Sequence, residues 1–315
     1  MKKFIVTEND ANQRLDKFLC KAAPELPSAL LYKSLRNKNI KRNRKRAEGA
    51  DRLQIGDTIE CWLPDELFAT PEYQYDFLQA RAELAVLYED DRMLLLNKPA
   101  GLLAHPDDEG EYVDTLLGRL RRYLYEKGEY DPARENSFAP ALCNRIDRNT
   151  QGIVIAAKTA EALRDLNEKI KRRKVQKFYL CAVHGVPKQG EKLKDGRRKL
   201  THWLMKSPEK SLVRVYDHPA AGAKESILKY RVLQEKNGLS LLEIELLTGR
   251  THQIRAQFSH INHALVGDGK YAPREQYRAD SAMGYKQQCL CSWRLVLDDL
   301  DVRVPEVAFI KELLN

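Results

Sequence analysis

Near the amino terminus, apolar residues recur at helical spacing in two short segments. In residues 13–23 leucine, phenylalanine and alanine share one face, and Pro24 and Pro27 then break the pattern. Ser28 stands where it can cap a second helix with a stripe of leucines. Short strand patterns interrupted by glycines follow, so we predict two helices and a small sheet in residues 1–65.

The pattern changes after this module. Residues 66–82 lack clear periodicity and contain Pro71, which predicts a linker. The remaining residues, 83–315, are predicted to form a second domain. Leucines at helical spacing indicate a helix over 113–125, and Thr159 can cap another that runs to about residue 173. A further helix is expected to open within 248–255 and to run through His263.

Strand patterns are more numerous than helix patterns in this second region. Strands are predicted at 84–88, 93–96, 153–157, 178–186, 227–233, 239–247, 293–297 and 302–304. Asn237-Gly238 is a strong hairpin signal, and residues 187–225 predict a β-rich excursion with mobile loops. Because few βαβ units appear, we expect the α+β class, with a mixed, mainly antiparallel sheet flanked by helices and loops.

Composition indicates the cellular compartment of the protein and the kind of molecule that it binds. The 315 residues are 31% charged and 43% hydrophobic, as in a globular protein with two domains, and no apolar run is long enough to span a membrane. The first residues lack the features of a secretory signal, and six scattered cysteines are typical of reduced thiols, so we expect a cytoplasmic protein. The net charge of +9 suits a polyanionic partner.

A dense run of positive charge lies in the predicted small sheet. Lys41, Arg42, Arg44 and Lys45 fall within five positions, and Arg36 lies on the polar side of the helix before them. A charge run is usually a solvated face, but its density in so small a fold indicates an RNA-binding surface.

The same module resembles the αL-type RNA-binding domain named after small-subunit ribosomal protein four. The resemblance rests on residues 14–19, 40–46 and 55–59. Asn43 and Arg44 stand where that family has Asn-Gly, so we expect a turn of a different shape.

The candidate chemistry centres on one aspartate. Asp147 lies between Arg145 and Arg148, at the mouth of the predicted strand 153–157. The arrangement suits a turn with an internal ion pair, and it equally suits a carboxylate held ionised as a nucleophile or base. Retaining glycosidases use such a carboxylate with a second acid, for which the sequence offers no convincing candidate. A lone carboxylate in a basic chain points to a glycosidic bond within a nucleic acid.

Residues 144–153 resemble the signature of the RNA pseudouridine synthases, specifically the ribosomal large-subunit synthase A family. Asn144 and Gln151 depart from the signature, which bears on substrate choice more than on chemistry. Further blocks follow in the family order at 88–106, 177–182 and 247–255, the last followed by Gly267-Asp268. The resemblance covers residues 84–305.

This resemblance implies a role for each candidate residue. Asp147 would be the nucleophile, Tyr179 would stack on the target uracil and assist proton removal from its carbon 5, and Arg255 would orient Asp147. Arg145 would displace the target nucleotide from its stack, because neither the anomeric carbon nor the base faces can be reached within a helix. The other residues that we expect to contact RNA are Arg148 and Arg250, and His105 and His252 are expected to support the site or the fold. No metal or cofactor is implied.

Three alternatives remain open. One alternative is a tyrosine recombinase, because His252 and Arg255 are followed by Tyr285 thirty positions after Arg255. Such an enzyme has no use for Asp147. An inactive synthase fold could act as a ribosome assembly factor. The substrate is expected to be large-subunit ribosomal RNA, since folded RNA needs contacts beyond the flipped base, and transfer RNA is the alternative. We expect a monomer.

Overall fold

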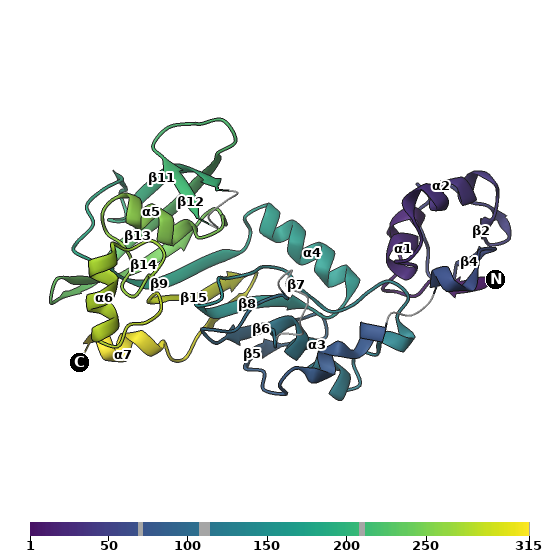
Figure 1. Cartoon of the computed structure of the whole chain (residues 1–315), viewed down its shortest axis with the longest axis horizontal. Helices are drawn as coiled ribbons and strands as arrows, with labels where there is room; N and C mark the ends of the chain where they lie inside the picture. Colours follow the sequence, from purple (N-terminus) through teal and green to yellow (C-terminus); the bar gives the residue numbers. More distant parts are fainter. Residues whose placement is uncertain (69–71, 107–113, 208–211, 315) are drawn as a thin grey trace.

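The computed structural model of the protein describes residues 1–68, 72–106, 114–207 and 212–314. These residues contain a sheet of four strands and a sheet of twelve. Figure 1 shows the small sheet and its two helices at one end of an elongated molecule. Most strand pairs are antiparallel, so the predicted α+β class with a mixed, mainly antiparallel sheet is confirmed. No helix within the described residues has both the length and the apolar character needed to cross a membrane.

The amino-terminal module packs two helices against an antiparallel sheet of order β1-β4-β2-β3. Its elements are β1 (Lys2–Ile5), α1 (Leu15–Ala22), α2 (Ser28–Arg36), β2 (Ile40–Arg42), β3 (Lys45–Arg46) and β4 (Thr58–Cys61). Phe18, Leu19 and Leu31 are fully buried between helices and sheet. The predicted cap of the second helix is wrong: Pro27 is the N-cap, and Ser28 is already helical, so its hydroxyl makes no capping bond.

The turn between β2 and β3 consists of Asn43 and Arg44. Both have positive φ, 51° and 63°, as the tight type I′ hairpin turn requires. The expectation of a differently shaped turn is therefore wrong in this respect. Arg44 occupies a left-handed conformation that usually takes glycine.

The described part of the predicted linker contains short helical segments. It contains two 3₁₀ helices, Asp65–Phe68 and Glu72–Gln79. Phe68 belongs to the core of the amino-terminal module, whereas the ring of Phe77 packs against Tyr125 and Tyr130 of the larger domain. Its aromatic residues, spaced without a helical or strand period, thus join the two cores.

Polar contacts hold the two parts together. Asp10 is fully buried and accepts hydrogen bonds from the Asn136 amide and the Ser137 hydroxyl of the larger domain. Asn9 donates to Glu135 and accepts from the backbone N–H of Ala160. These bonds fix how the module sits on the larger domain.

The large sheet has the order β10-β11-β13-β14-β9-β15-β8-β6-β5, with β12, β16 and β7 paired at its sides. Its strands are β5 (Val86–Glu89), β6 (Met93–Lys98), β7 (Ala141–Leu142), β8 (Gln151–Ala157), β9 (Gln176–His184), β10 (Glu191–Lys192), β11 (Arg198–Lys206), β12 (Val213–Tyr216), β13 (Lys224–Lys236), β14 (Leu239–Leu246), β15 (Leu290–Leu297) and β16 (Leu300–Arg303). The pair β8–β15 is parallel and the other strand pairs are antiparallel.

Both faces of the sheet are buried around β6 and β8, which explains their unbroken apolar runs. On β8, Val154 and Ala156 face one core with helix α3 (Leu116–Glu126), while Ile153 and Ile155 face the other with α4 (Ala160–Lys171). Thr159 accepts a hydrogen bond from the Ala162 N–H, so the predicted cap of α4 is confirmed.

The other predicted elements vary in how well they match. Asn237 and Gly238 have positive φ and join β13 to β14, which confirms the hairpin. Strands β10 to β12 make 187–225 β-rich, as predicted, and the start of the predicted helix at Val113 lies outside the described residues. The structure also contains helices α5 (Gln253–His260), α6 (Arg274–Ala282) and α7 (Ala308–Leu314), of which the last two were not predicted.

Gly152 permits the close approach of β8 to β15. Its φ is +126°, and a Cβ there would lie 2.2 Å from the Ser292 carbonyl oxygen. We expect Gly152→Ala to lower the free energy of unfolding by about 3 kcal/mol or more, because backbone must move. Urea unfolding measures this. Gly128→Ala is the matched control, since Gly128 also has positive φ but open space around it. Equal losses of stability in both variants would contradict a role for the close approach to Ser292.

Candidate active site

Asp147 opens onto a cavity of about 910 Å³ at the point where several elements converge. Its walls come from the loop after β6, the signature loop before β8, the end of α4, β9, and the segment that connects β14 to α5. Sheet register sets the level of the site: Ser292 on β15 pairs with Gly152 on one side and with Tyr179 on the other. The end of the signature loop and Tyr179 are therefore brought to the same height in the sheet.

Asp147 and Arg255 are in direct contact although 108 positions separate them. Arg255 Nη1 donates to Asp147 Oδ2 at 2.9 Å. The other edge of the guanidinium binds Asp268, with Nε and Nη2 donating at 2.7 and 2.8 Å. Burial alone would lower the pKa of Arg255, but the bonds and charges of Asp268 and Asp147 outweigh it and raise the pKa. Arg255 is thus a permanent cation shared by two carboxylates.

His252 stands on the other side of Asp147, with its Nε2 4.0 Å from Asp147 Oδ2. Its Nδ1 lies 2.8 Å from the hydroxyl of Tyr271, which itself accepts the Val213 N–H. His252 has φ of 52°, a left-handed conformation, at the start of α5. Burial lowers the pKa of His252, so a neutral imidazole faces the carboxylate at neutral pH.

Tyr179 lies in the wall of the cavity on β9 and is 7% exposed. Burial raises the pKa of its hydroxyl to about 12. At neutral pH the hydroxyl therefore keeps its proton, and the residue offers an aromatic face and a neutral hydroxyl.

Residues 92–260 match the family model for RNA pseudouridylate synthase. The chain belongs to this family. It is 31% identical to the ribosomal large subunit pseudouridine synthase C of Escherichia coli (strain K12), over 86% of this chain and 79% of that protein. It is 34% identical to an uncharacterized RNA pseudouridine synthase of Mycoplasma pneumoniae, over 85% of this chain and 80% of that one.

Solved structures show the same fold. The human RNA pseudouridylate synthase domain-containing protein 4 superposes with a TM-score of 0.58 at 19% identity, covering 76% of this chain and 95% of that one. The motifs predicted an RNA pseudouridine synthase, and this broad family is confirmed. The recombinase alternative is thereby excluded.

The two departures from the synthase signature make bonds to the protein itself. Asn144 Oδ1 accepts the Ile155 N–H at 2.8 Å, which ties the signature loop to β8. The Gln151 side chain donates to the Glu306 carbonyl, away from Asp147. Behind the loop, the fully buried Lys98 donates to three carbonyls, those of Pro99, Leu102 and Arg148. Lys98 thus links the sequence motif at residues 88–106 to Arg148, the residue after Asp147.

The predicted RNA-contacting residues fall into two groups. Arg145, Arg148 and Arg250 line the cavity, whereas the remaining five lie on the amino-terminal module. Among these five, Arg42 has its guanidinium paired with the buried carboxylate of Asp57 at 2.6 Å. Lys41 lies 4.7 Å above the ring of the exposed Trp62.

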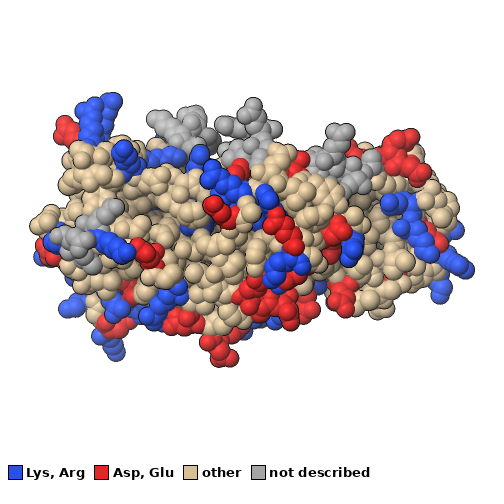
Figure 2. Space-filling model, turned by 90° about the horizontal axis from the view of Figure 1, so that it is seen from below, with Lys and Arg blue, Asp and Glu red and all other residues tan. Residues whose placement is uncertain are grey.

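Charge is unevenly spread over the synthase surface. On the face in Figure 2, acidic and basic side chains are interspersed along the molecule, so this face is not a continuous basic surface. The cavity differs, because its lining contains one carboxylate, Asp147, among seven cationic side chains. These are Arg145, Arg148, Lys171, Arg173, Lys177, Arg250 and Arg255.

One group of described residues has the spacing of metal ligands, a signal that sequence could not show. Ligand atoms of His202, Asp217 and His260 lie within 4.8 Å of one another. The Gln257 amide nitrogen lies 2.9 Å from His202 Nδ1 and 3.3 Å from the Ser226 carbonyl, so it donates to both. This leaves the His202 proton on Nε2, where a metal would need a lone pair. The group is therefore a hydrogen-bonded cluster in this arrangement.

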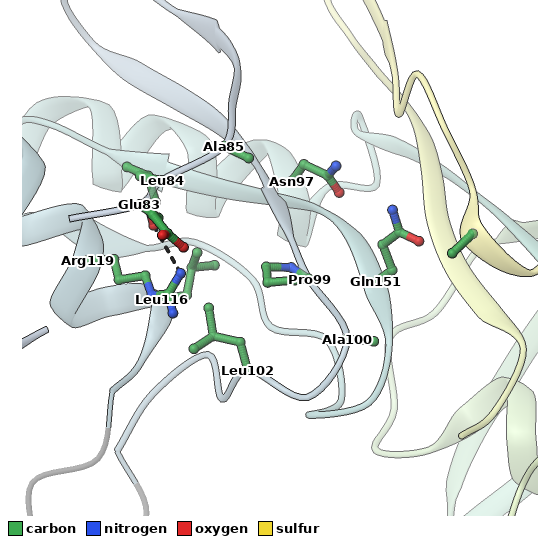
Figure 3. A pocket seen from close by; sticks show the side chains of 11 residues that line it. Glu83, Leu84, Ala85, Asn97, Pro99, Ala100, Leu102, Leu116, Arg119 and Gln151 are labelled. Atoms are coloured by element: carbon green, nitrogen blue, oxygen red, sulfur yellow. Dashed lines mark hydrogen bonds between the residues drawn. The ribbon is translucent and has the colours of Figure 1, made fainter. Parts of the chain in front are cut away.

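A second cavity of about 420 Å³ lies between β6, α3 and α7. Figure 3 shows its mainly apolar lining, in which Arg119 donates to the Glu83 carbonyl. Arg119 is also paired with Asp114. Its cation is already neutralised, so this cavity lacks the charge that an RNA site needs.

Proposed function

We propose that this synthase isomerises a uridine of large-subunit ribosomal RNA with Asp147 as the nucleophile. The observation that supports this most is the contact between Asp147 and Arg255 inside a cavity whose lining contains seven cationic side chains and, among the described residues, no other carboxylate. The cations attract the RNA phosphates, and the carboxylate meets the flipped nucleotide.

The proposed reaction conserves every atom of the uridine. A carboxylate oxygen of Asp147 attacks C1′, and the electron pair of the C1′–N1 bond moves onto the uracil. The detached uracil turns within the cavity, and C5 bonds to C1′ as the ester bond breaks. The proton on C5 then leaves and N1 takes up a proton, so that the product is an isomer of the uridine. Tyr179 would stack on the uracil, and Arg145 would displace the nucleotide from its stack. Because this is an isomerisation, the chemistry requires no cofactor.

We further propose that the chain belongs to the synthase A branch of the family. We also propose that residues 1–65 are an RNA-binding domain of the type named after small-subunit ribosomal protein four.

Two observations favour ribosomal RNA as the substrate. Curated relatives carry the name ribosomal large subunit pseudouridine synthase C. The amino-terminal module offers Lys41, Arg44 and Lys45 as contacts beyond the flipped base.

Mapping of pseudouridines tests the proposal. RNA from a strain that lacks the gene is incubated with wild type or with Asp147→Ala, and pseudouridines are located by chemical adduct and primer extension. We expect a new site in large-subunit RNA with wild type alone. A site in transfer RNA would replace the proposed substrate, and product formed by Asp147→Ala would contradict the nucleophile. If wild type leaves every uridine unchanged, the proposed substrate and the proposed nucleophile are both wrong, and the assembly-factor alternative replaces them.

The basic turn of the module gives a separate prediction. We expect the triple substitution of Lys41, Arg44 and Lys45 by glutamine to weaken RNA binding and to flatten the plot of log affinity against log salt, by roughly 0.7–0.9 for each phosphate that is no longer neutralised. Binding titrations at several salt concentrations measure both. Arg42→Gln is the control: because Arg42 pairs with Asp57, it should lower stability and leave the salt slope near that of wild type. An unchanged slope in the triple variant would exclude this surface.

A further inference from the structure

Asp268 is a fully buried carboxylate that holds the side chain of Arg255 in place. It binds Arg255 through both of its oxygens. Its Oδ1 also accepts the backbone N–H groups of Lys270 and Tyr271 at 3.0 and 3.1 Å. Two backbone donors thus fix the carboxylate, and the carboxylate in turn fixes the guanidinium.

The loop that carries Asp268 is itself rigidly seated. Gly267 has φ of +73°, and a Cβ there would lie 2.3 Å from the Gln287 carbonyl oxygen. The N–H of Gly267 is bound by the buried carboxylate of Asp280 at 2.8 Å. Tyr271, four positions after Gly267, places its ring 5.2 Å from the guanidinium carbon of Arg255. Arg255 is therefore held on one edge and on one face.

This arrangement limits what Arg255 can do to Asp147. A free arginine normally grips a carboxylate with two parallel hydrogen bonds. Here Nε and Nη2 are committed to Asp268, and Nη1 alone reaches Asp147, at Oδ2. Among the described residues, Asp147 Oδ1 has no hydrogen-bond partner, and the Asp147 side chain belongs to the lining of the cavity.

We propose that Asp268 is a positioning residue that restricts Arg255 to a single contact with Asp147 and so leaves Asp147 Oδ1 free to attack the ribose. This inference rests on the proposed nucleophilic role of Asp147. Without Asp268, the guanidinium fork turns toward Asp147, binds both of its oxygens and lowers its nucleophilicity.

Asp268→Asn tests the proposal, because an amide of the same shape repels one of the two Arg255 N–H groups that Asp268 now accepts. Single-turnover rates and RNA affinities are measured separately. We expect the rate to fall by about 10²-fold, a size typical of a misplaced reacting group, and the affinity to stay within about twofold of wild type. Asp268→Glu keeps the negative charge but displaces the guanidinium of Arg255, so it should also slow the reaction.

Asp280→Asn is the matched control. Asp280 is equally buried and binds the same loop, but within the described part of the chain its carboxylate holds Gly267 and His184 rather than Arg255. The substitution should lower the melting temperature without changing the rate of the folded enzyme. If Asp280→Asn and Asp268→Asn slow the reaction equally, Asp268 supports the loop alone and the proposal fails.

A double-mutant cycle provides the decisive measurement. In the background Arg255→Met, Asp268→Asn should cause no further loss of rate, because its effect passes through Arg255. Multiplying losses would overturn the proposal, as would a wild-type rate for a folded Asp268→Asn or Asp268→Glu. An active Asp147→Ala would instead overturn the proposed nucleophile, which keeps the two failures distinguishable.

Discussion

Asp147→Asn should abolish pseudouridine formation while RNA binding persists. An amide has nearly the shape of the carboxylate but neither its charge nor its nucleophilicity, so we expect the single-turnover rate to fall by about 10⁴-fold or more. The seven cationic side chains of the cavity lining remain, and affinity for RNA should therefore stay within a few-fold of wild type. Quenched reactions with labelled RNA, combined with binding titrations, measure the two quantities.

Asp301→Asn is the matched control for this variant. Asp301 is also a carboxylate between two arginines, Arg294 and Arg303, but it lies on β16, outside the cavity. Its substitution should leave the rate unchanged. A slow Asp301→Asn would mean that general loss of negative charge is responsible, and a rate for Asp147→Asn within about tenfold of wild type would contradict attack by Asp147.

Asp147→Asn should have little effect on the stability of the protein. Asp147 is a quarter exposed, and its loss leaves Arg255 paired with Asp268. We expect Asp147→Asn to change the free energy of unfolding by about 1 kcal/mol or less, measured by urea denaturation. A loss of activity in Asp147→Asn therefore cannot come from unfolding.

Local sequence signals predicted the elements that depend on local chemistry. Thr159 caps α4 because its hydroxyl needs only the N–H three positions on, and Asn237-Gly238 turns because both residues tolerate positive φ. Ser28 failed as a cap because α2 already begins at this residue and Pro27 occupies the N-cap. Helix α6, whose sequence is strongly polar, has no apolar stripe that periodicity could detect.

Contacts between residues that lie far apart in the sequence could not be predicted from local sequence signals. The resemblance of the motifs, not their spacing, predicted the pairing of Asp147 with Arg255. It did not predict that Asp268 takes the other edge of the guanidinium, or that Asp57 takes Arg42 out of the basic turn. A run of charges shows where cations are dense, whereas only tertiary packing shows which of them already have a buried partner. For this reason we expect Arg42, whose charge is neutralised by Asp57, to contribute less to RNA binding than its neighbours.

Arg255→Met should cost both activity and stability, for separable reasons. The side chain keeps its bulk but leaves the fully buried carboxylate of Asp268 without its cation, which we expect to lower the free energy of unfolding by about 3–5 kcal/mol. Asp147 also loses the donor that orients it, so the single-turnover rate should fall by about 10³-fold.

The two effects respond differently to a second substitution. Adding Asp268→Asn removes the unpaired charge and should restore about 1–3 kcal/mol of stability, whereas the rate should stay low because Asp147 is still unoriented. Urea denaturation and single-turnover rates measure the two quantities, and recovery of rate together with stability would show that Arg255 serves the fold and not the nucleophile.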